Sequence, residues 1–214
     1  MNSFAIFRVQ KLKRGRGKST LTQTLKHLEQ HATSATISHP EQSDKNKSKL
    51  YMTNEQAYKK RDELIKAHNS KAKRALRSDA SIALEMVFSF SHEMSDKIDI
   101  QAWCNANMRF LYENFNALTP IRIDLHMDEE TPHMHAVVFS TTKDGLISSR
   151  EALGDRQHLS QLQDAYASCV ASLGLSRGIS KELTRARHTS RDEWQRGEHL
   201  RCSHKDLADE ILDR

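Results

Sequence analysis

The sequence predicts an α+β domain of two layers, in which helices cover one face of a central, largely antiparallel sheet. Residues 121–127 alternate apolar and polar side chains with a period of two, and residues 133–138 do so again after a short acidic segment. This alternation is typical of half-buried strands, and a short connection between two of them makes a hairpin. Patterns in the rest of the chain complete the predicted order of elements, which is strand, helix, helix, strand, helix, strand, strand, helix, helix. A chain of 214 residues is long enough for one such domain.

The first elements are predicted from apolar runs and capping residues. Residues 3–10 form an apolar strand, and residues 11–18 are a loop rich in Gly, Lys and Arg. Ser19 or Thr20 can cap a helix over residues 19–31. Residues 32–49 are polar and contain a proline, which predicts a loop.

The middle of the chain begins with a helix from Thr53, its capping residue, to about His68. A basic connector over residues 71–79 follows. Residues 82–90 then alternate as a strand whose polar side includes Glu85. Residues 97–117, with Trp103 among their apolar side chains, predict a long helix before the hairpin at 119–142.

The C-terminal part begins with a tight turn predicted at Asp144-Gly145. Ser148 or Ser149 can cap the next element, and residues 156–172 form a helix that Gly174 and Gly178 end. Residues 189–214 are strongly charged and predicted to be helical. We therefore expect a main domain over residues 1–195 and a charged helical tail over 196–214, which we interpret as the start of a longer C-terminal region.

Three histidines of the hairpin predict a metal site. His133 and His135 lie at positions i and i+2 of a strand, so their side chains point the same way. The hairpin can bring His126 beside this pair. Three imidazoles on one face, with coordination positions left open, are typical of a divalent metal held for catalysis.

Acidic residues around these histidines can complete the site. Asp128, Glu129 and Glu130 lie in the hairpin loop, and Asp124 shares the histidine face by parity. Each can bind the metal or hold a ligand imidazole through its second nitrogen. Glu85 faces away from the apolar side of its strand, which suggests an orienting or proton-transfer role.

The charge distribution favours a nucleic-acid partner. The net charge is +5 and the isoelectric point is about 9.1. Basic residues gather in three runs, at residues 8–18, 45–49 and 71–77, which we expect to flank the candidate metal site. We expect phosphate contacts from these side chains: Arg8, Lys11, Lys13, Arg14, Lys26, Lys71, Lys73, Arg74 and Arg77. A basic protein with a three-histidine divalent site suggests phosphoryl chemistry.

Cysteine usage and hydropathy point to the cytoplasm. Cys104, Cys169 and Cys202 are far apart and odd in number, so neither a disulfide framework nor a zinc spacing is indicated. No apolar run approaches the length that spans a membrane, and we expect no membrane insertion. The apolar stretch Phe4–Val9 precedes basic residues, the reverse of the order in a secretory signal.

The stretch His-Met-Asp-Glu-Glu-Thr-Pro-His-Met-His at 126–135 resembles the metal motif of the Mob/Pre plasmid mobilisation relaxases, which belong to the HUH nucleases. Weaker similarities extend to about Trp194. They cover residues 7–13, the segment Leu25-Lys26-His27, residues 77–80 with Glu85, residues 145–149 and residues 174–178.

This resemblance implies a relaxase that binds plasmid DNA at an origin of transfer, as a single strand or a hairpin near the nick. Such an enzyme nicks one strand, stays covalently attached to the 5′ end and later rejoins the ends. His126, His133 and His135 are then the metal ligands, Mn²⁺ or Mg²⁺ is the ion, and Glu129 is the acidic residue of the motif. Nitrogen ligands suit manganese better than magnesium. Accessory and coupling proteins are further candidate partners.

The nucleophile is expected to be a histidine. Most relaxases attack through a tyrosine near the N-terminus, but no tyrosine precedes Tyr51. The predicted first helix offers His27 and His31, and the resemblance favours His27 because Leu25-Lys26 precede it. His31 remains the alternative. The family often has an arginine shortly after this histidine, whereas Leu28-Glu29-Gln30 follow here, so Lys26 or another basic residue is expected to orient the phosphate.

Two other functions stay open on the sequence alone. A rolling-circle replication initiator carries its tyrosine on a helix after the histidine motif, as Tyr166 does here. A DNA-binding module without strand cleavage is the second alternative.

Overall fold

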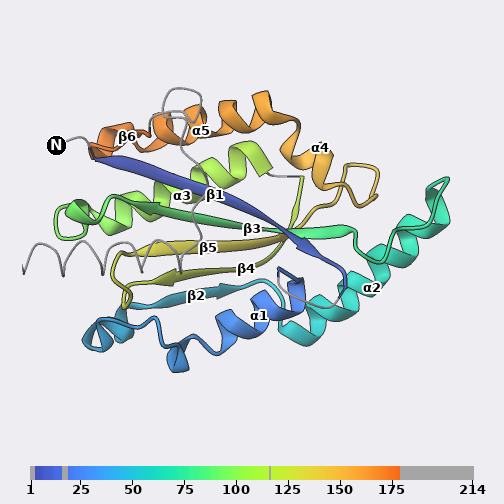
Figure 1. Ribbon diagram of the computed structural model, residues 1–214, viewed down its shortest axis with the longest axis horizontal. Coiled ribbons are helices and arrows are strands. Elements are labelled where there is room, and N and C mark those ends of the chain that lie inside the picture. The colour runs from blue at the N-terminus through green and yellow to red at the C-terminus, as the bar shows by residue number, and fades with distance from the viewer. Residues whose placement is uncertain (1–2, 16–18, 116, 179–214) are drawn as a thin grey trace, which may run out of the picture. The chain divides into compact units, whose positions relative to one another are not determined.

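The strands join into a sheet with the order β2-β4-β5-β3-β1-β6 (Figure 1). The computed structural model describes residues 3–15, 19–115 and 117–178. All neighbouring strands are antiparallel except β1 and β6, which are parallel. The strands are β1 (Phe4–Lys13), β2 (Lys47–Leu50), β3 (Ser81–Phe90), β4 (Thr119–His126), β5 (His133–Phe139) and β6 (Ser176–Arg177).

The helices begin where the sequence supplies capping side chains. Of the two expected caps, Thr20 is the one that caps the first helix. Ser19, the residue before it, has a positive φ of 62°. Thr53 and Gln56 form a reciprocal capping box, which satisfies two backbone donors at once. The α-helices are α1 (Leu21–Glu29), α2 (Asn54–Lys71), α3 (Ile100–Phe115), α4 (Ser149–Leu153) and α5 (Arg156–Val170); the 3-10 helices are η1 (His31–Thr33), η2 (Pro40–Lys45), η3 (His92–Met94) and η4 (Ala171–Leu173).

One face of the sheet carries the larger apolar core. The period-two side chains of β1, β3 and β5 pack there against α3 and α5. Phe7 and Phe88 stack with ring centroids 5.1 Å apart, and Phe110 and Tyr166 pack edge-on to each other at 5.3 Å. Aromatic contacts of this kind add to the stabilisation from burial. The predicted α+β fold class and largely antiparallel sheet are therefore confirmed.

The opposite face is partly covered as well. Leu21, Leu25 and Leu28 of α1 join Val137 and Phe139 of β5 in a second apolar core, to which α2 also contributes. By parity along β5, Val137 and Phe139 lie on the same face as His133 and His135. The expectation that helices cover one face only is thus wrong at this end of the sheet, because α1 has a leucine stripe that must be buried.

Two short strands were not expected. The end of the predicted loop 32–49 overlaps β2, which is exposed along its length and is held by pairing with β4. Strand β6 pairs with the first residues of β1. The turn at Asp144-Gly145 is confirmed: Gly145 has a φ of +76° and its N–H donates to the carbonyl of Thr142.

The predicted tail, the expected boundary at residue 195, and Cys202 lie outside the described residues. Within the described ranges, no helix combines the length and the apolar character needed to cross a membrane.

Candidate metal and DNA-processing site

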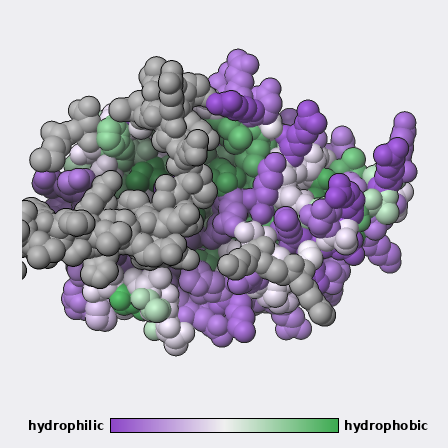
Figure 2. All heavy atoms as spheres, viewed as in Figure 1, coloured by the Kyte–Doolittle hydropathy of each residue, from purple (hydrophilic) through white to green (hydrophobic). Residues whose placement is uncertain are grey.

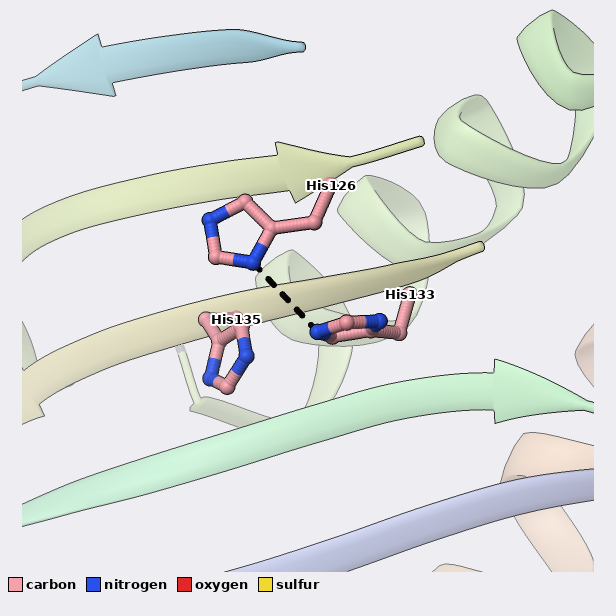
Figure 3. A group of neighbouring side chains, drawn as sticks. All are labelled: His126, His133 and His135. Carbon is pink, nitrogen blue, oxygen red and sulfur yellow. Dashed lines mark hydrogen bonds between the residues drawn. The ribbon is translucent and has the colours of Figure 1, made fainter. Parts of the chain in front are cut away.

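Strand register gathers the three histidines. His126, the last residue of β4, pairs directly with His133, the first residue of β5. His135 follows two residues later, and Figure 3 shows all three rings on the same side of the two strands. Because paired residues and residues two apart share a face, the pleat alone makes the imidazoles converge.

The imidazoles are close enough to share one ion. Nδ1 of His126 lies 3.3 Å from Nε2 of His133, and the ring centroids lie 4.9–5.1 Å apart. One nitrogen from each ring lies within 4.8 Å of the others. Burial, and then the neighbouring His135 and His133, lower the pKa of His126 to about 2. Burial and His135 also lower the pKa of His133. The rings of His126 and His133 are therefore neutral, which is the form that binds metals.

Two of these imidazole rings are held in orientation by a contact at the ring nitrogen that does not face the cluster. Nδ1 of His135 donates to Oε1 of Glu85 at 2.9 Å, and Nδ1 of His133 lies 3.0 Å from the carbonyl oxygen of Thr131. Both contacts leave Nε2 free toward the cluster. A carboxylate or carbonyl behind the imidazole is the usual arrangement around a metal-binding histidine, so this donor set fits a divalent ion.

The acidic residues of the hairpin loop behave differently from one another. Oε1 of Glu129 accepts a hydrogen bond from Thr36 at 2.8 Å and lies 3.9 Å from Nε2 of His133, so it faces the cluster. Glu130 is exposed. Asp124 is on the histidine face as expected, but it is bound by Arg122 at 2.6 Å and by Ser48 at 2.6 Å. Asp124 therefore holds β4 to β2 and Arg122 rather than an imidazole.

Asp128 is buried and joins the hairpin loop to the segment after α1. Its carboxylate accepts from Ser43 and Asn46, both at 2.7 Å, and contacts His31 at 2.8 Å. Its backbone carbonyl accepts from two further N–H groups of that segment, those of residues 38 and 39. Burial raises the pKa of Asp128, but the hydrogen bonds from His31, Ser43 and Asn46 outweigh it and lower this pKa to about 2.

The structure separates the two candidate nucleophiles. His31 is 7% exposed and stacks on His126, with ring centroids 3.6 Å apart and an angle of 13° between the planes. His27 is exposed in the last turn of α1, next to the exposed Lys26. His31 therefore lies against the three-histidine cluster, although from the sequence it was expected only as an alternative nucleophile. Its only sequence signal is the spacing of four residues from His27.

Tyr166, the tyrosine of the rolling-circle alternative, is wrongly placed for attack. It is 1% exposed and belongs to the apolar core on the face opposite the histidines. Burial raises its pKa, so the hydroxyl stays protonated. This alternative is excluded because DNA cannot reach the oxygen.

The register places Arg8 on the histidine face. Arg8 pairs with Val87, Val87 pairs with His135, and His135 pairs with Asp124, which makes one row across four strands. Neighbouring strands are about 4.8 Å apart, so Arg8 lies roughly 10 Å from His135. Lys11 instead pairs with Leu84 of the apolar face, so it points away from the site despite its exposure.

The other expected DNA contacts are exposed and partly adjacent. The N–H of Arg14 donates to the carbonyl of Ala80, and its side chain reaches the carbonyl of Leu76. Arg14 therefore lies beside the basic connector. The set comprises Lys13, Arg14, Lys71, Lys73, Arg74 and Arg77, although Arg77 is paired with Asp79 and Lys71 donates to the carbonyl of Asp144. Figure 2 shows hydrophilic side chains over α1 on the face it presents.

Comparison with solved structures supports the fold. The relaxase domain of MobM was solved with manganese and with oriT DNA of plasmid pMV158. It aligns with a TM-score of 0.71 and 26% identity, over 91% of this chain and 99% of that one.

Curated relatives agree. A plasmid recombination enzyme type 1 of Staphylococcus aureus is 28% identical over 82% of this chain and 47% of its own length. A plasmid recombination enzyme of Streptococcus agalactiae is 23% identical over 99% of this chain and 42% of its own length. The chain spans about half the length of such relatives.

A family-level comparison covers nearly the whole chain. The Mob_Pre family, described as plasmid recombination enzyme, matches residues 1–196. The matched range contains the three-histidine hairpin, Glu85, the first helix and all three basic runs. This chain therefore belongs to the Mob_Pre family of plasmid recombination enzymes.

Proposed function

We propose that this chain is a metal-dependent DNA relaxase that nicks and rejoins one strand at a plasmid origin of transfer. The observation that carries the proposal is the cluster of three imidazoles, two of which are oriented by hydrogen bonds through the second ring nitrogen. It lies in a fold similar over 91% of this chain to a relaxase domain that holds oriT DNA and manganese. We assign residues 1–195 to the relaxase domain and residues 196–214 to a charged tail.

His126, His133 and His135 hold the ion, Mn²⁺ in preference to Mg²⁺ because all three ligands are nitrogens. A divalent ion bound there supplies positive charge that polarises the scissile phosphate. Glu85 and the carbonyl of Thr131 fix the ring orientations, so the ligands need not reorganise when the substrate arrives.

His27 is the attacking group. It is exposed to substrate at the end of α1, one turn before the buried His31. A ring nitrogen of the neutral imidazole bonds to phosphorus while the bond from phosphorus to the 3′ oxygen breaks. The imidazole N–H proton leaves to water at the exposed ring, and the 3′ oxygen takes up a proton from water. The product is a protein–DNA phosphoramidate at the 5′ phosphate, and the reverse reaction rejoins the strand.

The DNA lies across the histidine face, where Arg8 and Lys26 contact phosphates and the loop and connector extend the basic path. Phosphate contacts of this kind give affinity but no sequence specificity. The specificity must come from base contacts near the nick. The substrate is plasmid DNA, single-stranded or folded as a hairpin near the nick. Accessory and coupling proteins are further partners, and the cytoplasm is the location.

A nicking assay tests the proposal. Supercoiled DNA that carries the region flanking the coding sequence is incubated with the protein, with Mn²⁺ or with a chelator. We expect nicked circles and a covalent adduct with Mn²⁺ only, and neither in the double variant His133→Ala/His135→Ala. Full nicking by that variant in the presence of chelator would refute the metal-dependent reaction. Binding without cleavage under all conditions would leave a DNA-binding module.

A further inference from the structure

His126 differs from the other two histidines of the cluster in how its ring is held. The rings of His133 and His135 are fixed at Nδ1, by the carbonyl of Thr131 and the carboxylate of Glu85. In His126, Nδ1 faces Nε2 of His133 at 3.3 Å (Figure 3), and within the described ranges no hydrogen bond reaches its Nε2. The last torsion of a histidine side chain has broad energy wells. Hydrogen bonds from behind therefore do not determine the plane of this ring.

The face of the His126 ring is covered by the ring of His31. Their centroids lie 3.6 Å apart and their planes are 13° from parallel. His133 and His135 instead meet the His126 ring at 86° and 47°. Both stacked rings are buried, so a rotation of the His126 ring about its last torsion would drive its edge into His31. The flat contact with His31 therefore fixes the plane of the His126 ring.

His31 can act as a support because it is itself anchored. Its Nε2 lies 2.8 Å from Oδ1 of Asp128. Ser43 and Asn46 both donate to the other oxygen of that carboxylate, Oδ2, so Asp128 accepts throughout. Nε2 of His31 therefore donates its hydrogen to Asp128. Because Asp128 is buried and held from several sides, the position of the His31 ring is fixed as well.

The remaining contacts of His31 show that its ring face, rather than its second nitrogen, meets the cluster. Nδ1 is fully buried and has no hydrogen-bond partner among the described residues. Oε1 of Glu129 lies 3.8 Å from it. An ion in the plane of the His126 ring lies outside the plane of the stacked His31 ring, so His31 does not bind that ion. The ring thus has one anchor, at Nε2, and one working surface, its face on His126.

We propose that His31 is a positioning residue: anchored by Asp128, it holds the ring of His126 in the orientation in which Nδ1 faces the neighbouring ligand His133. The inference rests on the proposed function, since it concerns the same ion. A ring that is held before the ion arrives need not be ordered on binding, and the loss of this support should weaken ion affinity about three- to tenfold. The two histidines of this region then have separate roles: His27, exposed, attacks, and His31, buried, orients a ligand.

Two variants separate the ring of His31 from its hydrogen bond. His31→Gln can still donate an amide N–H to Asp128 but has no ring, whereas His31→Phe keeps a flat ring but cannot donate. Mn²⁺ dissociation constants are measured by competition with a chelating indicator, with the exposed His39→Gln of the same segment as the matched control.

We expect about three- to tenfold weaker Mn²⁺ affinity in His31→Gln, and affinity close to that of the wild type in His31→Phe and His39→Gln. A merely structural role of His31 would not produce this difference, because both changes alter the same buried position. Wild-type affinity in His31→Gln, or equal weakening in His31→Gln and His31→Phe, would overturn the proposal.

A second measurement uses the wild-type protein, so it does not depend on the folding of a variant. A ring stacked on His126 shields its carbon-bound ring protons, so their proton resonances should lie upfield of those of the exposed His39 in the ion-free protein. Imidazole ¹⁵N resonances are then followed during a titration with Zn²⁺ as a diamagnetic probe. We expect one nitrogen of each of the three ligands to move to a metal-bound position, and neither nitrogen of His31.

The outcomes of this titration distinguish the two proposals. Unshielded ring protons of His126, or a metal-bound nitrogen of His31, would overturn the positioning role alone. Shielded protons without any metal-bound nitrogen would contradict the metal site of the proposed function, and with it the role of His31 toward the ion.

Discussion

Glu85 and His135 are joined by a hydrogen bond of 2.9 Å across two neighbouring strands, although 50 residues separate them in the chain. Both side chains are largely buried. The bond fixes which nitrogen of His135 carries the hydrogen, because a carboxylate only accepts. It therefore determines that Nε2 of His135 faces the cluster.

Removing this carboxylate should weaken metal binding. We expect Glu85→Ala to lower Mn²⁺ affinity about ten- to a hundredfold, because His135 loses the group that orients it. Glu85→Gln, whose amide oxygen can still accept, should lose less. Isothermal titration with Mn²⁺ measures both, with the exposed Glu93→Ala as control. Wild-type affinity in Glu85→Ala would show that the bond does not orient the ring.

The nature of the covalent adduct should identify the attacking residue. If His27 attacks, the adduct is a phosphoramidate, which is labile in acid and stable in alkali, and His27→Ala forms none. Tyr→Phe changes at Tyr51, Tyr58 and Tyr166 should leave the adduct intact. Mass spectrometry of the peptide that retains the nucleotide provides the measurement. An acid-stable adduct, or normal adduct levels in His27→Ala, would rule His27 out.

Arg8 and Lys11 should differ sharply although they lie three residues apart on β1. Arg8 shares the row of His135, whereas Lys11 pairs with Leu84 of the apolar face. We expect Arg8→Gln to lower DNA affinity and to reduce its salt slope by about 0.7–0.9, the loss of one phosphate contact. Lys11→Gln should change neither. Binding isotherms at several salt concentrations test this, and identical slopes for the two variants would contradict the assignment.

The buried pair Arg122–Asp124 should matter for stability. Two hydrogen bonds of 2.6 Å join these side chains, and both are almost inaccessible to solvent. Arg122→Ala leaves the Asp124 charge buried without its guanidinium, which we expect to cost about 3–5 kcal/mol of unfolding free energy. Urea denaturation measures the change. The exposed pair Arg77–Asp79 is the control, since Arg77→Ala should cost less than about 1 kcal/mol.

Tyr166 should make stability sensitive to alkali. Burial raises its pKa in the folded protein, so its contribution is fully present below the ordinary tyrosine pKa near 10. As the pH rises further, the unfolded chain ionises first and this stability is lost toward the folded-state pKa. Urea denaturation between pH 8 and 11 should therefore show a steeper decline for the wild type than for Tyr166→Phe. Parallel curves would argue against the raised pKa. Tyr166→Phe should also nick normally.

The sequence predicted what depends on local periodicity. The alternation of Ile121 to Met127 defined β4, and the two-residue spacing of His133 and His135 placed both on one face. The cap at Thr53 was predicted because the capping box lies within four residues. The metal cluster belongs to this class, since its three residues lie within one hairpin.

Contacts that depend on distant partners could not be predicted. The burial of His31 depends on Asp128, 97 residues away, whereas the predicted helix 19–31 shows His27 and His31 only as neighbours; in the structure α1 ends at Glu29 and His31 lies in η1. Strand β2 was missed because Lys47–Leu50 has no apolar face of its own and is ordered by β4. The side that Arg8 faces also depends on its pairing with β3.

Asp128 holds the segment from His31 to Asn46 against the hairpin through five hydrogen bonds, three to its carboxylate and two to its carbonyl. The hairpin can bring its own histidines together early in folding, but Asp128 acquires these partners only when the distant segment docks. Docking of this segment and ordering of the hairpin loop should therefore stabilise each other. The loop that joins the two histidine-bearing strands thus takes its final shape from residues that lie more than eighty positions earlier in the chain.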